Sequence, residues 1–163
     1  MGWDQATQNF GISIFDDGRL VYYDVIRFVG ETEERLVKIY NFLQYFIEVC
    51  EPDFVMFEDI QLQANGASQT MFNTFKVLAE LMGVVKMVLT KNKIRHECVL
   101  NKVWQSQFNI AGKQRMEQKK NVMKKVKQLF DIDVTDDVAD AILIGKYAYN
   151  KYCKQTHPTE TLF

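Results

Sequence analysis

The sequence predicts an α/β fold in which a mixed sheet, with three antiparallel strands and then parallel strands, is flanked by helices. Two β-rich runs near the N-terminus are separated by the turn sequence Asp16-Asp17-Gly18, which is typical of a hairpin. After the hairpin, short apolar runs alternate with segments whose apolar residues recur at helical spacing. Antiparallel strands followed by alternating strands and helices indicate a mixed sheet covered by helices.

Each expected element has its own signal. Apolar residues at helical spacing from Leu36 to Cys50 predict the first helix, and Glu51-Pro52-Asp53 ends it. The buried strand FVMF closes with Glu58, and a polar loop over 61–69 follows, with Ser68 as a helix N-cap. In chain order we expect strands at 1–3, 10–15, 20–28, 54–57 and 94–100, and helices at about 36–50, 70–90, 116–130 and 136–151.

The composition favours a globular intracellular protein. The 163 residues, 47% of them hydrophobic, fit one domain over 1–163, and 12 Phe, 7 Tyr and 2 Trp argue against disorder. No apolar run of about 18 residues predicts a membrane span, and no basic segment followed by an apolar one predicts a secretory signal. The cysteines Cys50, Cys98 and Cys153 suit neither a disulfide framework nor a metal site, so we expect a reducing, cytoplasmic setting.

The charge is distributed unevenly along the chain, although the net charge is only −1. Residues 1–63 hold twelve acidic and four basic side chains, a net charge of −8, whereas residues 101–127 hold eight basic ones and Glu117, a net charge of +7. Such asymmetry is consistent either with a DNA-binding face or with a solvated helix face. The basic residues of this segment are Lys102, Lys113, Arg115, Lys119, Lys120, Lys124, Lys125 and Lys127.

Four acids stand at the ends or starts of predicted elements. Asp4 and Glu58 end two predicted strands, and Asp137 and Asp140, three residues apart, share a face of the last predicted helix. Each acid alone has a structural explanation, such as an Asx turn or a favourable charge at a helix N-terminus. Together they would repel one another unless a cation neutralised them. Carboxylate oxygens suit Mg²⁺ or Mn²⁺, and two such ions about 4 Å apart activate water and stabilise a leaving phosphate oxygen.

Three segments resemble the motifs of RuvC-type Holliday junction resolvases, which belong to the ribonuclease H-like superfamily. GWDQATQNFGISIF resembles the first motif, an aspartate at the end of the first strand followed by a glycine-containing second strand. FVMFEDIQLQANGASQT resembles the second, a glutamate at a strand end before a polar loop and a long helix. DDVADAILIGKYAY resembles the last motif, in which two aspartates separated by two residues precede small and apolar helix residues.

The resemblance implies a Mg²⁺-dependent homodimeric endonuclease, with Mn²⁺ as a substitute, that cuts opposed strands of a four-way junction. By motif, Asp4, Glu58, Asp137 and Asp140 would be catalytic and hold two metal ions. Asp136 competes with Asp137, because Asp136 and Asp140 also share a helix face. Lys119 stands where the family has a lysine near the scissile phosphate, and a solvated surface lysine is the alternative. The apolar residues of the helix at Met71–Val88 exceed a single face, which fits either burial in the core alone or additional burial against a partner subunit. The glutamine after Asp4 is closer to the phage-encoded branch, which implies a host-cell cytoplasm.

Three departures from the family pattern affect the interpretation. Only three residues precede Asp4, which a trimmed N-terminus would explain. Gln61 stands where the cellular branch has an aromatic residue that stacks on junction bases, so we expect Gln61 to contact DNA and sequence selectivity to be weak. Trp104 and Gln105 occupy the region of a second family lysine.

Other functions remain open from the sequence alone. The chain is too short for the two domains of a sugar-kinase or actin-like protein. A noncatalytic module that binds branched DNA, and a ribonuclease H-like enzyme that cuts RNA–DNA hybrids, would both fit the predicted fold. The expected DNA contacts are Gln61, Lys113, Arg115, Lys119, Lys120, Lys124, Lys125 and Lys127, and branched DNA, including three-way and Y forms, is the expected partner.

Overall fold

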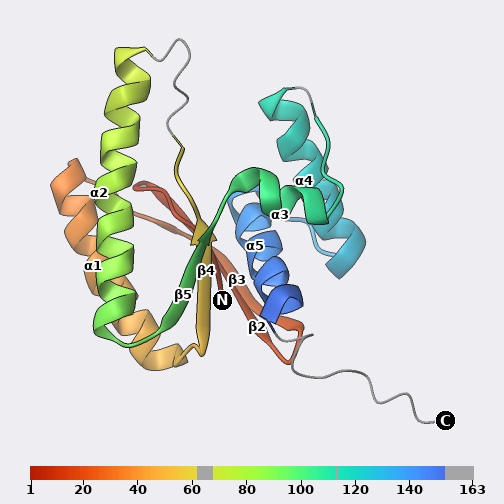
Figure 1. Ribbon diagram of the computed structural model, residues 1–163, viewed down its shortest axis with the longest axis horizontal. Coiled ribbons are helices and arrows are strands. Elements are labelled where there is room, and N and C mark those ends of the chain that lie inside the picture. The colour runs from red at the N-terminus through yellow and green to blue at the C-terminus, as the bar shows by residue number, and fades with distance from the viewer. Residues whose placement is uncertain (62–67, 113, 153–163) are drawn as a thin grey trace.

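A five-stranded sheet in the order β3-β2-β1-β4-β5 forms the centre of the molecule, with helices on both faces (Figure 1). The structure is a computed structural model and describes residues 1–61, 68–112 and 114–152. The elements are β1 (Gly2–Asp4), β2 (Asn9–Asp16), β3 (Arg19–Arg27), α1 (Thr32–Cys50), β4 (Phe54–Glu58), α2 (Gln69–Lys91), β5 (Arg95–Val99), α3 (Asn101–Gln107), α4 (Arg115–Phe130) and α5 (Asp136–Tyr152).

The strand pairing confirms the predicted mixed sheet. β1 is antiparallel to β2 and parallel to β4, β2 is antiparallel to β3, and β4 is parallel to β5. The predicted hairpin turn is also confirmed: Asp17 and Gly18, with φ angles of 44° and 79°, connect β2 to β3. Positive φ at both central residues gives a turn whose twist matches that of the strands, which explains the Asp-Gly sequence.

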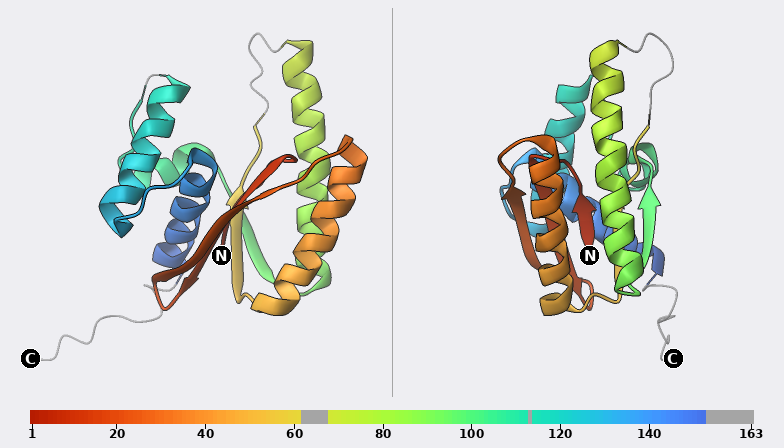
Figure 2. Two further views of the ribbon diagram at one scale, coloured as in Figure 1. Left: turned by 180° about the vertical axis from the view of Figure 1, so that it is seen from behind. Right: turned by 90° about the vertical axis from the view of Figure 1, so that its left-hand side faces the viewer.

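The helices divide between the two faces of the sheet (Figure 2). Helices α1 and α2 cover one face, where Trp3, Phe10, Ile12, Val55 and Phe57 of the strands are buried against them. Helix α5 crosses the other face in contact with β1, β2, β3 and β4, and α3 and α4 pack against α5. Because successive side chains of a strand point to opposite faces, each central strand contributes alternate residues to the two layers.

Small residues bring α5 unusually close to the sheet. A Cβ atom on Gly2 would overlap the backbone of Gly145 and Ala141, and one on Gly11 would overlap the carbonyl oxygen of Asp137. Ser13, which is fully buried, donates a hydrogen bond of 2.7 Å to the carbonyl oxygen of Ala141. The start of α5 therefore lies directly over β1 and β2, where β1 ends.

Most of the predicted elements are confirmed, with two differences. Helix α1 begins at Thr32, about one turn before its apolar pattern, and the short helix α3 was not predicted. Seven residues are too few to show a helical period, so the apolar pattern of the sequence does not reveal α3. In the structure Trp104 of this helix is buried. Ser68 does cap α2, because its side chain accepts a hydrogen bond of 3.3 Å from the Met71 amide. Within the described ranges, none of the helices has the length and apolarity that crossing a membrane requires.

Candidate active site

The carboxylates of Asp4 and Glu58 share the α5 face of the sheet. Asp4 ends β1 and Glu58 ends the neighbouring parallel strand β4. Their chain neighbours Trp3 and Phe57 are fully buried in the core under α1 and α2, so the two acids point the other way. Asp137 lies in the first turn of α5, and its backbone oxygen lies against Gly11, the residue paired with Asp4 in the sheet. Three distant segments therefore bring carboxylates to one end of the sheet.

The electrostatics of Asp4 and Asp140 reflect this crowding. Burial raises the pKa of Asp4 well above its usual range, and the negative charges of Asp140, Glu58 and Asp137 raise it further, while Lys119 opposes them. The pKa of Asp140 is raised to about 8, first by burial and next by the charge of Glu58, again with Lys119 opposing. The four acids predicted from sequence therefore lie within electrostatic reach of one another and act as a single charge cluster.

Glu58 is held in place by neutral hydrogen-bond donors from α3. Its carboxylate accepts hydrogen bonds from Asn101 Nδ2, at 3.3 and 3.4 Å, and from the indole Nε1 of the fully buried Trp104, at 3.2 Å. Burial raises the pKa of Glu58, while these two donors and the positive charge of Arg115 oppose that rise. The backbone of Glu58 is also fixed, because its carbonyl accepts a hydrogen bond from the side chain of Gln5.

Lys119 and Asp136 form an ion pair beside the cluster. Lys119 Nζ donates to Asp136 Oδ2, and this hydrogen bond lowers the pKa of Asp136. The charge of Asp137 acts on both Asp4 and Asp140, whereas that of Asp136 acts on Asp140 and is compensated by Lys119. Asp136 is therefore engaged by Lys119, whereas Asp137 acts on two acids of the cluster, and the assignment of Asp137 as a ligand stays a prediction.

The donor chemistry of the cluster fits a divalent cation of the Mg²⁺ type. The four side chains offer only carboxylate oxygens, and their mutual repulsion in a desolvated position would be relieved by a bound positive charge. Among the residues that the structure describes, no three acidic, histidine or cysteine side chains converge on one point as a complete ligand set. The Glu58 carboxylate instead accepts hydrogen bonds from Asn101 and Trp104, and Asp136 pairs with Lys119.

The predicted DNA-contacting residues have different surroundings. Arg115, at the start of α4, lies close enough to Glu58 for its charge to affect the carboxylate, whereas Lys127 is paired with Asp131 and Asp133 at 3.2 and 2.9 Å. Gln61 is exposed just after β4, and Lys113 lies outside the described residues. The other predicted lysines on α4 are exposed at Lys120 and Lys124 and half-buried at Lys119 and Lys125.

Asn101 and Trp104 are the site residues that sequence reasoning did not identify. Trp104 was noted only because it occupies the region of a missing family lysine, and no motif marks either residue as a partner of Glu58. The available signal was a tryptophan and an asparagine close to the end of the strand next to β4. These two residues can be recognised as partners of Glu58 only once the parallel pairing of β4 with β5 is known, because that pairing brings Val99 beside Glu58.

Comparison with known proteins assigns the family. The sequence model described as "Crossover junction endodeoxyribonuclease RuvC" matches residues 1–146, whereas curated protein sequences give no significant match. The chain is similar in structure to T. thermophilus RuvC in complex with Holliday junction substrate, with a TM-score of 0.72 at 14% identity over 94% of this chain and 93% of that chain. It is also similar to another Thermus thermophilus RuvC structure, with a TM-score of 0.68 at 14% identity over 95% of both chains.

A third similar structure is that of the yeast mitochondrial Holliday junction resolvase Ydc2, with a TM-score of 0.54 at 14% identity over 96% of this chain and 83% of that chain. At these identities the structural matches establish the fold, which is the ribonuclease H-like arrangement predicted from the sequence. The family match spans β1, β4 and most of α5, and so includes all four clustered acids. The chain belongs to the RuvC family of crossover junction endodeoxyribonucleases.

Proposed function

We propose that this protein is a structure-selective endonuclease that cleaves four-way junctions and related branched DNA by metal-dependent hydrolysis of a phosphodiester. The observation that carries the proposal is the cluster of Asp4, Glu58, Asp137 and Asp140 at the end of the sheet in a chain of this family. The cluster would bind DNA poorly on its own, because phosphates and carboxylates repel one another. A cation-loaded site removes that repulsion.

The four acids would hold Mg²⁺, or Mn²⁺ in its place, as two ions per site. When bound, these ions would supply the activation of water and the neutralisation of charge at the leaving oxygen. Asn101 and Trp104 keep the Glu58 carboxylate oriented. Asp136 pairs with Lys119, whose ammonium would offset negative charge that develops on the phosphate.

The basic side chains of α4 would bind the phosphates of the DNA arms. Arg115, Lys120 and Lys124 are exposed on this helix, which packs against α5 and so lies next to the acidic cluster. Lys127 is a weaker candidate, because Asp131 and Asp133 already neutralise it. Lys119, Lys125 and Lys113 complete the proposed surface. Such contacts give affinity without reading sequence.

A twofold dimer would place two active sites in a fixed relation for cleavage of opposed strands. Helix α2 is the proposed interface. It packs on the core only from Leu81 onward, whereas Met71 and Phe72 are 41% and 46% exposed on a segment that extends past the end of the sheet (Figure 1). Light scattering of the protein with and without junction DNA tests this, and a monomer of 19.1 kDa in both cases would contradict it.

The proposed enzyme recognises branch shape rather than sequence. Gln61 cannot supply the stacking of an aromatic side chain, worth about 1–3 kcal/mol per base, although its amide can donate a hydrogen bond to DNA. Three-way and Y junctions should therefore be cut along with four-way junctions. Cleavage of a mobile junction confined to one short consensus sequence would contradict this part of the proposal.

A substrate panel tests the function directly. We expect cleavage of four-way, three-way and Y junctions in Mg²⁺ or Mn²⁺, no cleavage in chelator, and little cleavage of linear duplex. Preferential cleavage of RNA–DNA hybrids would instead support a ribonuclease H-like activity. Tight junction binding without cleavage under any divalent cation would support a noncatalytic branched-DNA-binding module.

A further inference from the structure

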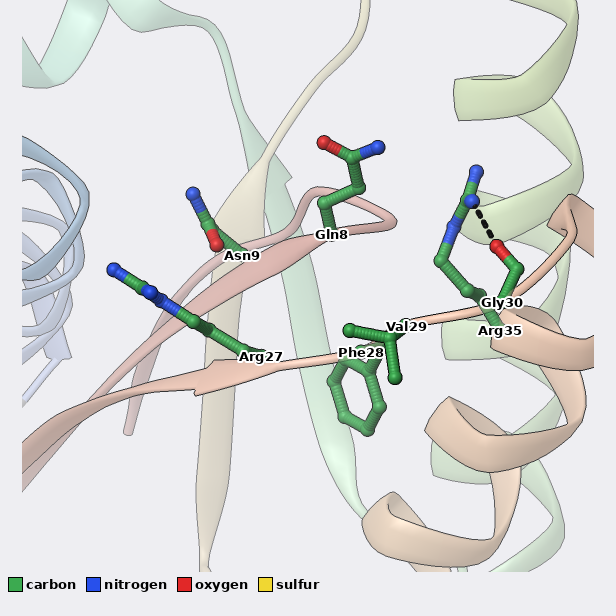
Figure 3. A pocket seen from close by; sticks show the side chains of 7 residues that line it. All are labelled: Gln8, Asn9, Arg27, Phe28, Val29, Gly30 and Arg35. Atoms are coloured by element: carbon green, nitrogen blue, oxygen red, sulfur yellow. Dashed lines mark hydrogen bonds between the residues drawn. The ribbon is translucent and has the colours of Figure 1, made fainter.

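The β2–β3 hairpin carries a second polar site on the same face of the sheet as the acidic cluster. Asn9 pairs with Arg27 across the hairpin, two residues along from the Gly11–Val25 pair. Gly11 lies against α5 and Val25 belongs to the core on that side, so alternation places Asn9 and Arg27 on the α5 face. In Figure 3 both side chains project to the same side of the hairpin, while the Phe28 ring points away from them.

This site lies within reach of a DNA strand that occupies the active site. Asp4 pairs with Gly11 and Gly11 with Val25, so Arg27 is two strands across the sheet and two residues along it from Asp4. With strands ~4.8 Å apart and a rise of ~3.4 Å per residue, the two Cα atoms are about 12 Å apart. Since a DNA strand carries a phosphate about every 3.4 Å along the helix axis, this separation corresponds to a few nucleotides.

The side chains around this position are suited to an anion. A cavity of about 430 Å³ has Arg27 and Asn9 at one end and Arg35 at the other, with Gln8, Phe28, Val29 and Gly30 between them, and none of these described lining residues is acidic (Figure 3). Arg27 is exposed and forms no ion pair within the described part of the chain, although the acidic cluster lies on the same face. Guanidinium and amide N–H groups together match the oxygens of a phosphate.

Arg35 is held in position by its neighbours. Its guanidinium donates to the Gly30 carbonyl oxygen at 2.5 Å and to Thr32 Oγ1 at 3.2 Å, and its buried Nε has no partner among the described residues. The Glu34 carboxylate lies beside Gly30 at the rim of the cavity, and the Lys38 ammonium lies next to it. The balance of charge around the cavity is therefore positive.

We propose that Arg27, with Asn9, binds a backbone phosphate of the junction arm that flanks the cleavage site on the hairpin side, opposite to the basic helix α4. This inference rests on the proposed function. The cleaved strand would then be held on both sides of the acidic cluster, by α4 on one side and by the hairpin on the other. A strand fixed on both sides enters the active site in one orientation.

The test compares Arg27→Ala with Arg19→Ala. Arg19 is an exposed arginine on the same strand, but it pairs with Asp16 at the far end of the hairpin. Binding of the full chain to a synthetic four-way junction is measured in chelator over a range of salt. Arg27→Ala should weaken binding about tenfold, as expected for a lost charge-assisted hydrogen bond, and reduce the salt slope by about 0.9. Arg19→Ala should change the affinity less than about twofold and leave the slope unchanged.

The Arg27→Lys variant distinguishes the contribution of positive charge from that of the planar, bidentate guanidinium group. It should keep the salt slope and recover part of the affinity, because lysine binds phosphate as a point charge. The inference is overturned if wild-type protein cuts the junction while Arg27→Ala, with an unchanged melting temperature, binds it with wild-type affinity and slope. Failure of wild-type protein to bind or cut any junction would remove the proposed function and this site with it.

Discussion

The two faces of the central sheet serve different purposes, although the same strands build both. On the α1–α2 face, Trp3 and Phe57 are large, apolar and fully buried. On the α5 face, the next residues along the same strands are Asp4 and Glu58. Burial disfavours the ionised form of both acids, and at Asp4 the charges of the neighbouring acids add to this effect. One face contributes favourable burial free energy, and the other carries charges that oppose folding in the absence of a cation. The burial free energy of the apolar face can therefore offset the cost of the acidic cluster on the other face.

The largest expected effects come from substituting two adjacent residues of β4 that face opposite sides of the sheet. Phe57→Ala should destabilise the protein by about 3–5 kcal/mol through lost burial and a cavity, while the remaining folded molecules keep the wild-type cleavage rate. Glu58→Gln should lower the cleavage rate at least about 10³-fold, equivalent to about 4 kcal/mol, and leave junction binding intact. Thermal unfolding and single-turnover cleavage of a four-way junction measure the two effects. Wild-type cleavage by Glu58→Gln would end the catalytic assignment of this face.

The second prediction compares two glycines within helices. A Cβ at Gly145 of α5 would meet the Ser13 hydroxyl and the Phe15 ring, whereas a Cβ at Gly83 of α2 would meet nothing within 4 Å. Gly145→Ala should therefore destabilise the protein by about 2–3 kcal/mol, because α5 must move away from the sheet. Gly83→Ala should stabilise it by up to about 1 kcal/mol through helix propensity. Chemical denaturation with both variants measures the difference, and equal effects would show that close packing of α5 is unimportant.

The apolar face of the sheet was the part that sequence could predict, because its information is local. The FVMF run and the helical spacing from Leu36 to Cys50 identify their elements directly, and the Asp-Gly turn fixes the hairpin. The four acids were predicted as a group from their places at element ends and from motif resemblance. The hydrogen-bond donors that hold Glu58 were not predicted. Trp104 reaches Glu58 only because β4 pairs with β5, a strand 41 residues further along the chain. The role of Gly145 likewise depends on a helix that packs against the first strand.

The third prediction concerns the loss of folding stability that the buried acids of the α5 face cause. The pKa of Asp140 is raised to about 8 from an ordinary value of 3.8, so the folded protein binds this proton more tightly than the unfolded chain does. The wild-type protein without divalent cations should therefore lose stability as the pH rises from about 4 to about 8. The Asp140→Asn variant has no titrating carboxyl at this position and so does not lose this stability. Its melting temperature should be about 5 °C above that of the wild type at pH 8 and closer to it at pH 5.

Differential scanning calorimetry in chelator at several pH values checks this expectation. Asp53→Asn, which changes an exposed acid just before β4, is the matched control and should follow the wild-type pH dependence. A constant difference between Asp140→Asn and wild type across the pH range would contradict a titrating carboxyl at this position.

The smallest effect distinguishes two buried indoles on opposite faces. Trp104 and Trp3 are both fully buried, but Trp104 Nε1 donates to Glu58 Oε2, whereas Trp3 Nε1 has no partner within the described residues. Trp104→Phe should lower the cleavage rate about fivefold to tenfold, roughly 1–1.4 kcal/mol, while Trp3→Phe leaves the rate per folded molecule unchanged. Both variants lose similar packing, so their losses of thermal stability should be comparable apart from the lost hydrogen bond.

The pH profile of cleavage separates orientation of Glu58 from a general structural effect of the Trp104 substitution. The Trp104 hydrogen bond lowers the pKa of Glu58 against the opposing effect of burial, so its removal should raise that pKa. In the proposed mechanism cleavage requires the ionised Glu58 carboxylate. The acidic limb of the profile should therefore move to higher pH in Trp104→Phe and stay in place in Trp3→Phe. An unchanged limb together with a reduced rate would assign Trp104 to packing alone. A shifted limb in both variants would mean that the two faces are coupled through the sheet rather than independent.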